Sequence, residues 1–201
     1  MIWFSCLLLI LLPLIAHGSD VKNLTSINGF EAGMELERFE SNLGITVDHF
    51  SMLDPSLTVR NGYKVWKLGK CMSKDEHLGY CSERKQANLA IGGVEVSAIY
   101  YHPKSKSIRF DLASHGYGKS GAEFNYQRWK DAWGLVNYLT SQHEHEWTTD
   151  YLGCGATGCA TEHSLHQGDG RYITVGKGTP GANYVFIKLS REPDETNRID
   201  F

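Results

Sequence analysis

One run of this chain alternates residue types that can bind a metal ion, His143-Glu144-His145-Glu146. On an extended segment alternate histidines point the same way, and imidazole is a common ligand of zinc and copper. The run also follows a predicted helix, where a histidine interacts favourably with the helix dipole and a polar sequence ordinarily forms a solvated end. We favour the helix end, and predict neither a bound metal nor a cofactor.

A hydrolytic site could be assembled from Asp111, His115 and Ser120 as orienting group, base and nucleophile. Ser120, however, begins a Ser-x-x-Glu capping box with Glu123, Asp111 occupies an outward position in a predicted strand, and no nucleophile-elbow sequence surrounds the serine. If the protein is an enzyme, the candidates for its catalytic groups are Asp111, His115, His143 and His145.

Aromatic residues offer a different chemistry, because sugar rings stack on flat aromatic faces. Trp129 and Trp133 lie on the apolar stripe of a predicted helix and should pack in the core. Trp147 and Tyr151 fall between that helix and a pair of cysteines, in a segment that we expect to be a glycine-rich loop over residues 146–170. They are the candidates for a binding surface.

The N-terminal residues predict that the protein is secreted. An apolar run from Ile2 to Ile15 precedes Ala16-His17-Gly18, which is typical of a signal peptide over residues 1–18 and leaves one secreted domain, 19–201, with flexible ends. The run is too short to span a bilayer as a helix, so we expect no stable membrane span. Asn23 begins an Asn-x-Thr triplet and is a predicted glycosylation site.

Four cysteines remain after removal of Cys6: Cys71, Cys81, Cys154 and Cys159. An even number in an oxidising compartment predicts two disulfides. Three pairings are possible, and we favour bridges from the early pair to the late pair, because they would close the longest loops. A net charge of -3 with interspersed signs does not suggest nucleic-acid binding.

Hydrophobic periodicity predicts an α+β fold. Apolar and polar residues alternate over 94–112, which predicts a hairpin with one buried face. We expect a second hairpin from residues 171–175 and 183–189, and a further strand over 62–68. A long amphipathic helix should run from Ser120 to near His143, and a short one over 34–43 should end at Gly44. The order of these strands and helices along the chain favours a disulfide-stabilised two-layer sandwich, in which the long helix packs on one face of an antiparallel sheet.

Several short motifs together resemble the β-subunit region of secreted yeast killer toxins over about residues 63–160. They are Gly69-Lys70-Cys71, Gly79-Tyr80-Cys81, the helix with Trp129 and Trp133, and Gly153-Cys154. The resemblance implies a fungal secreted cytotoxin that recognises glucan or mannoprotein on a competing yeast. Such toxins are cut at Lys-Arg sites and have a separate hydrophobic subunit proposed to form pores. This chain contains Arg84-Lys85 but no Lys-Arg, and no hydrophobic pore-forming segment remains in the predicted mature chain, so we expect cell-surface recognition rather than pore formation.

Three functions therefore remain as hypotheses. We favour a killer-toxin-like module that binds a polysaccharide or glycoprotein of a target cell. The alternatives are a secreted hydrolase that uses a His/Asp site, and a non-catalytic effector with a protein partner. Binding to insoluble glucan or chitin would separate the first from the other two.

Overall fold

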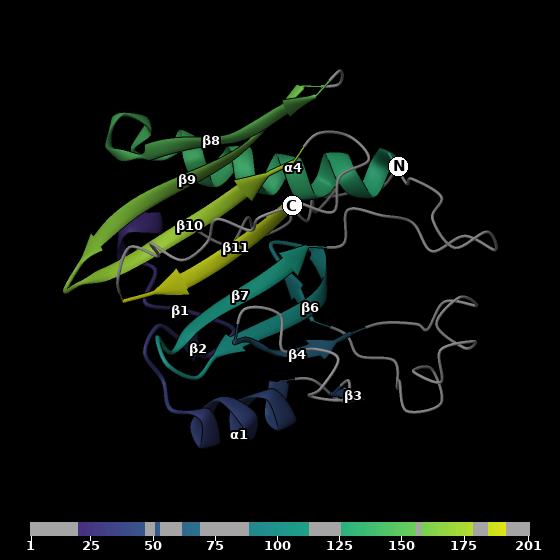
Figure 1. Ribbon diagram of the computed structural model, residues 1–201, viewed down its shortest axis with the longest axis vertical. Coiled ribbons are helices and arrows are strands. Elements are labelled where there is room, and N and C mark those ends of the chain that lie inside the picture. Colours follow the sequence, from purple (N-terminus) through teal and green to yellow (C-terminus); the bar gives the residue numbers. More distant parts are fainter. Residues whose placement is uncertain are drawn as a thin grey trace, which may run out of the picture.

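The computed structural model describes residues 20–46, 51–52, 62–68, 89–112, 126–155, 158–178 and 185–191. Within them, two α-helices pack on an antiparallel sheet whose strands follow the order β3-β4-β6-β7-β11-β10-β9-β8, with β5 paired to the side of β6 (Figure 1). The predicted α+β two-layer sandwich is confirmed.

The elements have the following bounds. The helices are η1 (Val21–Asn23), α1 (Leu36–Thr46), α4 (Tyr126–Ser141) and η2 (Glu144–Glu146). A small separate hairpin consists of β1 (Ser26–Ile27) and β2 (Phe30–Glu31). The main sheet contains β3 (Ser51–Met52), β4 (Lys64–Lys67), β5 (Ala90–Ile91), β6 (Val94–His102), β7 (Ser107–Leu112), β8 (Thr148–Gly155), β9 (Gly158–Gly168), β10 (Arg171–Lys177) and β11 (Val185–Ser190).

One face of the main sheet is apolar. Its central row crosses five strands through directly paired residues, Trp66, Ile99, Phe110, Ile187 and Val175. All five are at most 2 % exposed. Paired residues on neighbouring strands have side chains on the same face, so this row joins β4 to β10 in one continuous core.

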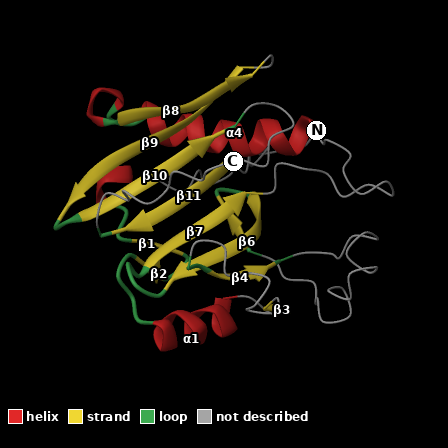
Figure 2. Ribbon diagram, viewed as in Figure 1, coloured by secondary structure: helices red, strands yellow, loops and turns green. Residues whose placement is uncertain are grey.

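Both helices cover this apolar face, α4 over the β8–β11 end of the sheet and α1 over the β4 end (Figure 2). Phe39 of α1 packs with ring centroids 4.9 Å from Trp66 and from Tyr101. At the other end, Lys177 on the same face of β10 donates a hydrogen bond from Nζ to Thr140 Oγ1 of α4 at 2.9 Å. The sandwich is therefore one layer of helices and one layer of sheet.

Both predicted hairpins are confirmed, as β6–β7 and as β10–β11, and so is the strand within 62–68. The predicted alternation with one buried face is confirmed in β7 but not throughout β6. A register shift between Val96 and Ala98 changes the alternation, so that Ile99 and Tyr101 are buried and Tyr100, which was expected on the buried face, lies on the other side of the sheet.

Two expectations were wrong. Residues 146–170 are mainly the hairpin β8–β9 rather than a loop, since their glycines lie at a bulge, at the turn and at the strand end. The helix α1 continues through Gly44 to Thr46, because a glycine ends a helix only where it adopts the left-handed conformation, and Gly44 has no positive φ.

Other predicted features lie outside the described residues. They are the signal peptide, the capping box at Ser120, the candidate His115, the dibasic pair Arg84-Lys85, and the cysteines Cys71 and Cys81. Of the helices that are described, none is long and apolar enough to cross a membrane.

The aromatic cluster around α1 generates a stability prediction. Replacing Phe39, which is fully buried, with alanine should lower the free energy of unfolding by about 3–5 kcal/mol through lost burial and a cavity. The matched control on the same helix is Ile45→Ala, since Ile45 is 81 % exposed and should change stability by less than about 0.5 kcal/mol. Urea unfolding measures both, and equal midpoints would contradict the packing of α1 on the sheet.

Candidate functional site

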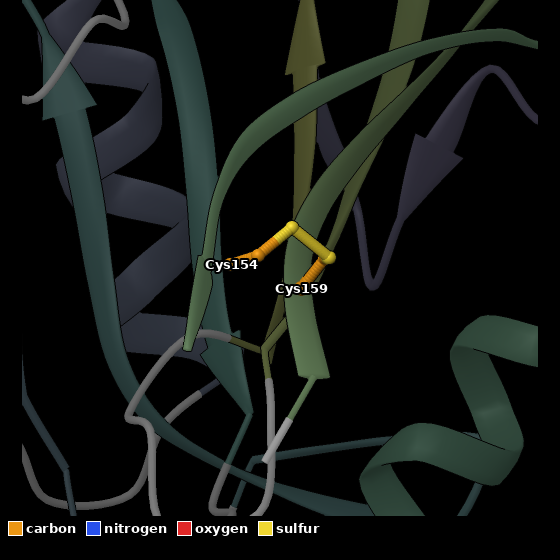
Figure 3. The surroundings of a disulfide bond; sticks show 2 residues. All are labelled: Cys154 and Cys159. Atoms are coloured by element: carbon orange, nitrogen blue, oxygen red, sulfur yellow. A yellow bond between two sulfur atoms is a disulfide. The ribbon is translucent and has the colours of Figure 1, made fainter. Parts of the chain in front are cut away.

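A disulfide between Cys154 and Cys159 closes the end of the β8–β9 hairpin (Figure 3). The prediction that each late cysteine bonds to an early one was wrong. The loop-closure argument rewards long loops, but strand register places Cys154 directly opposite Cys159 across the turn, and this proximity decides the pairing. Both cysteines are exposed.

Four side chains on one face of this hairpin form a surface that we call the hairpin patch: Thr149 and Tyr151 of β8, and Thr161 and His163 of β9. Tyr151 pairs with Thr161 and Thr149 with His163, so all four point to the same side. This is the face that α4 covers farther along the sheet. Tyr151 is 75 % exposed, one of three large hydrophobic side chains that stand out among the described residues. The predicted binding residue Tyr151 is therefore on the surface, on a strand rather than in a loop.

Hydrogen bonds order the polar part of the patch. The His163 ring lies between two hydroxyl groups, with Nδ1 2.8 Å from Thr149 Oγ1 and Nε2 3.1 Å from Thr161 Oγ1. Burial lowers the pKa of His163, and the nearby charge of Lys177 lowers it further. The imidazole is consequently neutral at neutral pH, with one ring nitrogen that donates and one that accepts.

The second predicted binding residue, Trp147, has a different place. It is half-buried against the core, and its indole Nε1 donates to the carbonyl oxygen of Gln142 at 2.8 Å. Trp147 thus ties the start of β8 to the end of α4, and it supports the hairpin instead of presenting an open aromatic face.

The candidate catalytic residue His143 belongs to an ion cluster at the end of α4. His143 Nε2 is 2.7 Å from Asp20 Oδ1 and its Nδ1 is 3.3 Å from Glu146 Oε1, while Lys22 also pairs with Glu146. His145 is exposed on η2. These contacts fasten the N-terminal turn η1 to the end of the long helix, which is a structural role.

Asp111 does not meet these histidines. Its carboxylate accepts from Arg109 Nε at 2.6 Å, on the face of β7 opposite to the helices. The candidates Asp111 and His143 therefore lie on opposite sides of the sheet, and the described structure does not bring them together. Within the described ranges, three or more histidine, cysteine or acidic residues nowhere gather as a metal site would need.

The face of the sheet that carries Asp111 is polar, and sequence reasoning missed it. A row of directly paired residues crosses it through Tyr100, Arg109, Lys188, Thr174 and Ser164. Lys188 is fully buried and Thr174 is 8 % exposed. The signal in the sequence was a lysine inside Val185–Ser190, a strand that is otherwise almost wholly apolar.

Tyr63, just before β4, lies beside this polar row. Burial raises its pKa, while a hydrogen bond with Ser107 and the charge of Arg109 act in the opposite direction.

The ion cluster predicts a pH dependence of stability. The backbone N–H of Lys22 and then His143 hold the pKa of Asp20 below its usual range, and Lys22 does the same for Glu146. A carboxylate with a depressed folded pKa stabilises the protein above its unfolded pKa, and the contribution is lost as pH falls through the folded value. Stability should therefore decrease on acidification below about pH 4.5.

The measurement is the urea midpoint at pH 6 and at pH 3. Between pH 6 and pH 3, the Asp20→Asn variant should lose less stability than the unchanged protein, because position 20 then carries no carboxylate that can be protonated. Asp169→Asn is the control, since Asp169 is 92 % exposed on the β9–β10 turn and should behave like the unchanged protein. An identical drop in all three would contradict the role of the cluster.

The predicted glycosylation site is accessible. Asn23 and Thr25 are both exposed, and the Asn23 amide is 3.3 Å from Asp20 Oδ2 in an exposed hydrogen bond. When a yeast host secretes the protein, digestion with an N-glycosidase should lower its mass, and Asn23→Gln should abolish the difference. An unchanged mass after digestion would show that the triplet is unused.

Comparisons with known proteins found no match to this chain, neither a family model, nor a curated protein, nor a solved structure. Function is therefore inferred from the chain's own side chains and their arrangement.

Proposed function

We propose that the chain is a secreted module that binds a polysaccharide of the cell surface through the hairpin patch. The observation that supports this most directly is the exposure of Tyr151 beside three polar side chains on one face of a disulfide-closed hairpin. A disulfide on the surface is in keeping with an oxidising compartment, as the expected signal peptide requires.

The chemistry of the patch suits a sugar. The Tyr151 ring is flat and accessible, so it can cover the apolar C–H face of a pyranose while its hydroxyl stays in water. The hydroxyl groups of Thr149 and Thr161 can each donate and accept hydrogen bonds, and the neutral imidazole of His163, which contacts both hydroxyl groups, holds them in place. Sugar hydroxyls have the same double capacity, whereas a charged side chain would favour an ionic ligand.

The hairpin also holds the patch in place before a ligand arrives. Trp147 fixes the start of β8, the disulfide closes the far end, and seven register pairs join β8 to β9. A surface that is already ordered loses little conformational entropy on binding, and a tyrosine has only two side-chain torsions to immobilise. Modest contacts can then give measurable affinity, and repetition of sugars along a polymer adds avidity.

The resemblance to killer-toxin β-subunits suggests which polymer to test. Glucan and mannoprotein of a fungal wall are the ligands that the resemblance implies, and growth inhibition of yeast is its biological consequence. Binding and inhibition are separate properties, because the hairpin patch accounts only for attachment to the surface.

Wall binding tests the proposal. Mature protein should be depleted from solution by isolated yeast walls, insoluble glucan, chitin or immobilised mannan, and Tyr151→Ala should weaken this binding about tenfold, the loss typical of a central aromatic contact. Tyr138→Ala is the matched control, because Tyr138 is also an exposed tyrosine, at 53 %, but lies on α4. Its isotherm should coincide with that of the unchanged protein.

The same isotherm with reduced protein examines the hairpin itself. Reduction should weaken binding if the disulfide orders the patch, and circular dichroism shows whether the fold survives. Failure of the unchanged protein to bind any wall fraction, or an equal loss for Tyr138→Ala and Tyr151→Ala, would refute the hairpin patch as a glycan site.

A further inference from the structure

The sheet has one long edge that no described strand covers. Its strand order ends at β3 on one side and at β8 on the other, and Figure 1 shows β8 as the outermost strand. The β3 edge is only Ser51–Met52, whereas β8 runs over Thr148–Gly155. In an antiparallel sheet, every second residue of an edge strand directs its N–H and C=O away from the neighbouring strand. The outer side of β8 therefore offers a row of backbone donors and acceptors, and none of them pairs with another strand in the described ranges.

The side chains of β8 leave this edge open. Thr148, Thr149, Asp150 and Tyr151 are all exposed, and they form the regular part of the strand before the register shift that precedes Gly153. Proteins commonly protect a sheet edge with lysine, proline or a bulge. The segment over 148–151 contains none of these, and threonine and tyrosine have high β-propensity. It is thus suited to pair with one more strand.

The charge beside this edge indicates what kind of strand could pair with it. Asp150 is exposed and is the one charged residue of β8, and its direct partner across the hairpin, Glu162, is also acidic. Glu144 on η2, just before the strand, is exposed as well. In the part of the chain that the structure describes, neither Asp150 nor Glu144 forms an ion pair. A strand that brings a positive side chain next to Asp150 would therefore gain a favourable cross-strand pair.

A second copy of the chain fits this edge poorly. If two β8 strands paired about a two-fold axis at Thr149, Asp150 or Tyr151, the two Asp150 side chains would lie directly opposite or diagonal to each other. Like charges that face each other destabilise a strand pair, and the segment over 148–151 contains no positive side chain to offset them. An extended segment with positive side chains has the complementary charge, so it is the partner that the edge favours.

We propose that the outer edge of β8 binds an extended peptide segment in which lysine or arginine alternates with β-branched residues. The backbone of this segment forms hydrogen bonds with β8 and adds one more strand to the sheet, which is a recurring mode of peptide recognition. Because side chains alternate between the two faces, its basic residues lie beside Asp150, and its β-branched residues lie beside Thr149 and Tyr151 on the other face. Binding rests on backbone groups at the edge, so it does not depend on glycan binding by the hairpin patch.

Fluorescence anisotropy tests the proposal with the mature chain and a labelled peptide that alternates valine and lysine. The peptide should bind saturably, and Asp150→Lys should weaken binding about three- to tenfold, because an attraction becomes a repulsion. The same variant should prefer a peptide that alternates valine and glutamate. Asp169→Lys is the control with the same change of charge, since Asp169 is 92 % exposed on the β9–β10 turn, and its isotherm should match that of the unchanged protein. Absence of saturable binding, or equal weakening by both variants, would overturn the assignment to β8.

Methylation of the peptide backbone tests the strand pairing itself. Methyl groups on the alternate peptide nitrogens that face β8 should abolish binding, whereas methyl groups on the other set should preserve it, because only one side of an added strand bonds to the edge. Equal affinity for the two methylated peptides would overturn strand addition. Sedimentation of the chain without peptide should show a monomer, and a dimer that the lysine peptide dissociates would assign the edge to a second copy instead.

Discussion

The structure depends on the burial of one face of an antiparallel sheet. The row from Trp66 to Val175 links five strands, of which β7 and β11 pair although they are far apart in the chain, and both helices pack against the apolar face that contains this row. Because side chains alternate along a strand, a slip of one residue at any of these pairings would move apolar groups to the polar face. The same alternation therefore fixes where every polar side chain of the sheet lies.

Because side chains alternate, the burial of the apolar face also fixes which residues lie on the second face of the sheet. This second face is unusual because charged residues on it are buried or partly buried. Positions that alternate with the apolar row carry Arg109, Lys188 and Glu162, of which Lys188 is fully buried and the other two are partly buried. Buried charges require partners or a shifted protonation state. The stability contributed by the helix-covered face must offset the cost of burying these groups.

The β8–β9 hairpin shows how a surface can be built at the edge of such a sheet. It extends beyond the helix layer, so the face that is apolar and covered in the middle of the sheet becomes polar and exposed around Tyr151. Trp147 and the Cys154–Cys159 bridge hold the two ends of this extension. The exposed hairpin patch and the packed core thus occupy different parts of the same sheet face.

The amino-acid sequence by itself determined the elements whose side chains repeat with a clear period: the β6–β7 and β10–β11 hairpins, and the body of the long helix α4. It also singled out Tyr151 as a surface aromatic. Local periodicity is enough for these features, because each depends on neighbours within a few residues. Only the tertiary structure decided the pairing of Cys154 with Cys159, the separation of Asp111 from His143, and the meeting of Lys188 with Arg109. These depend on which strands become neighbours, and strand register is set by packing of the whole sheet rather than by any short segment.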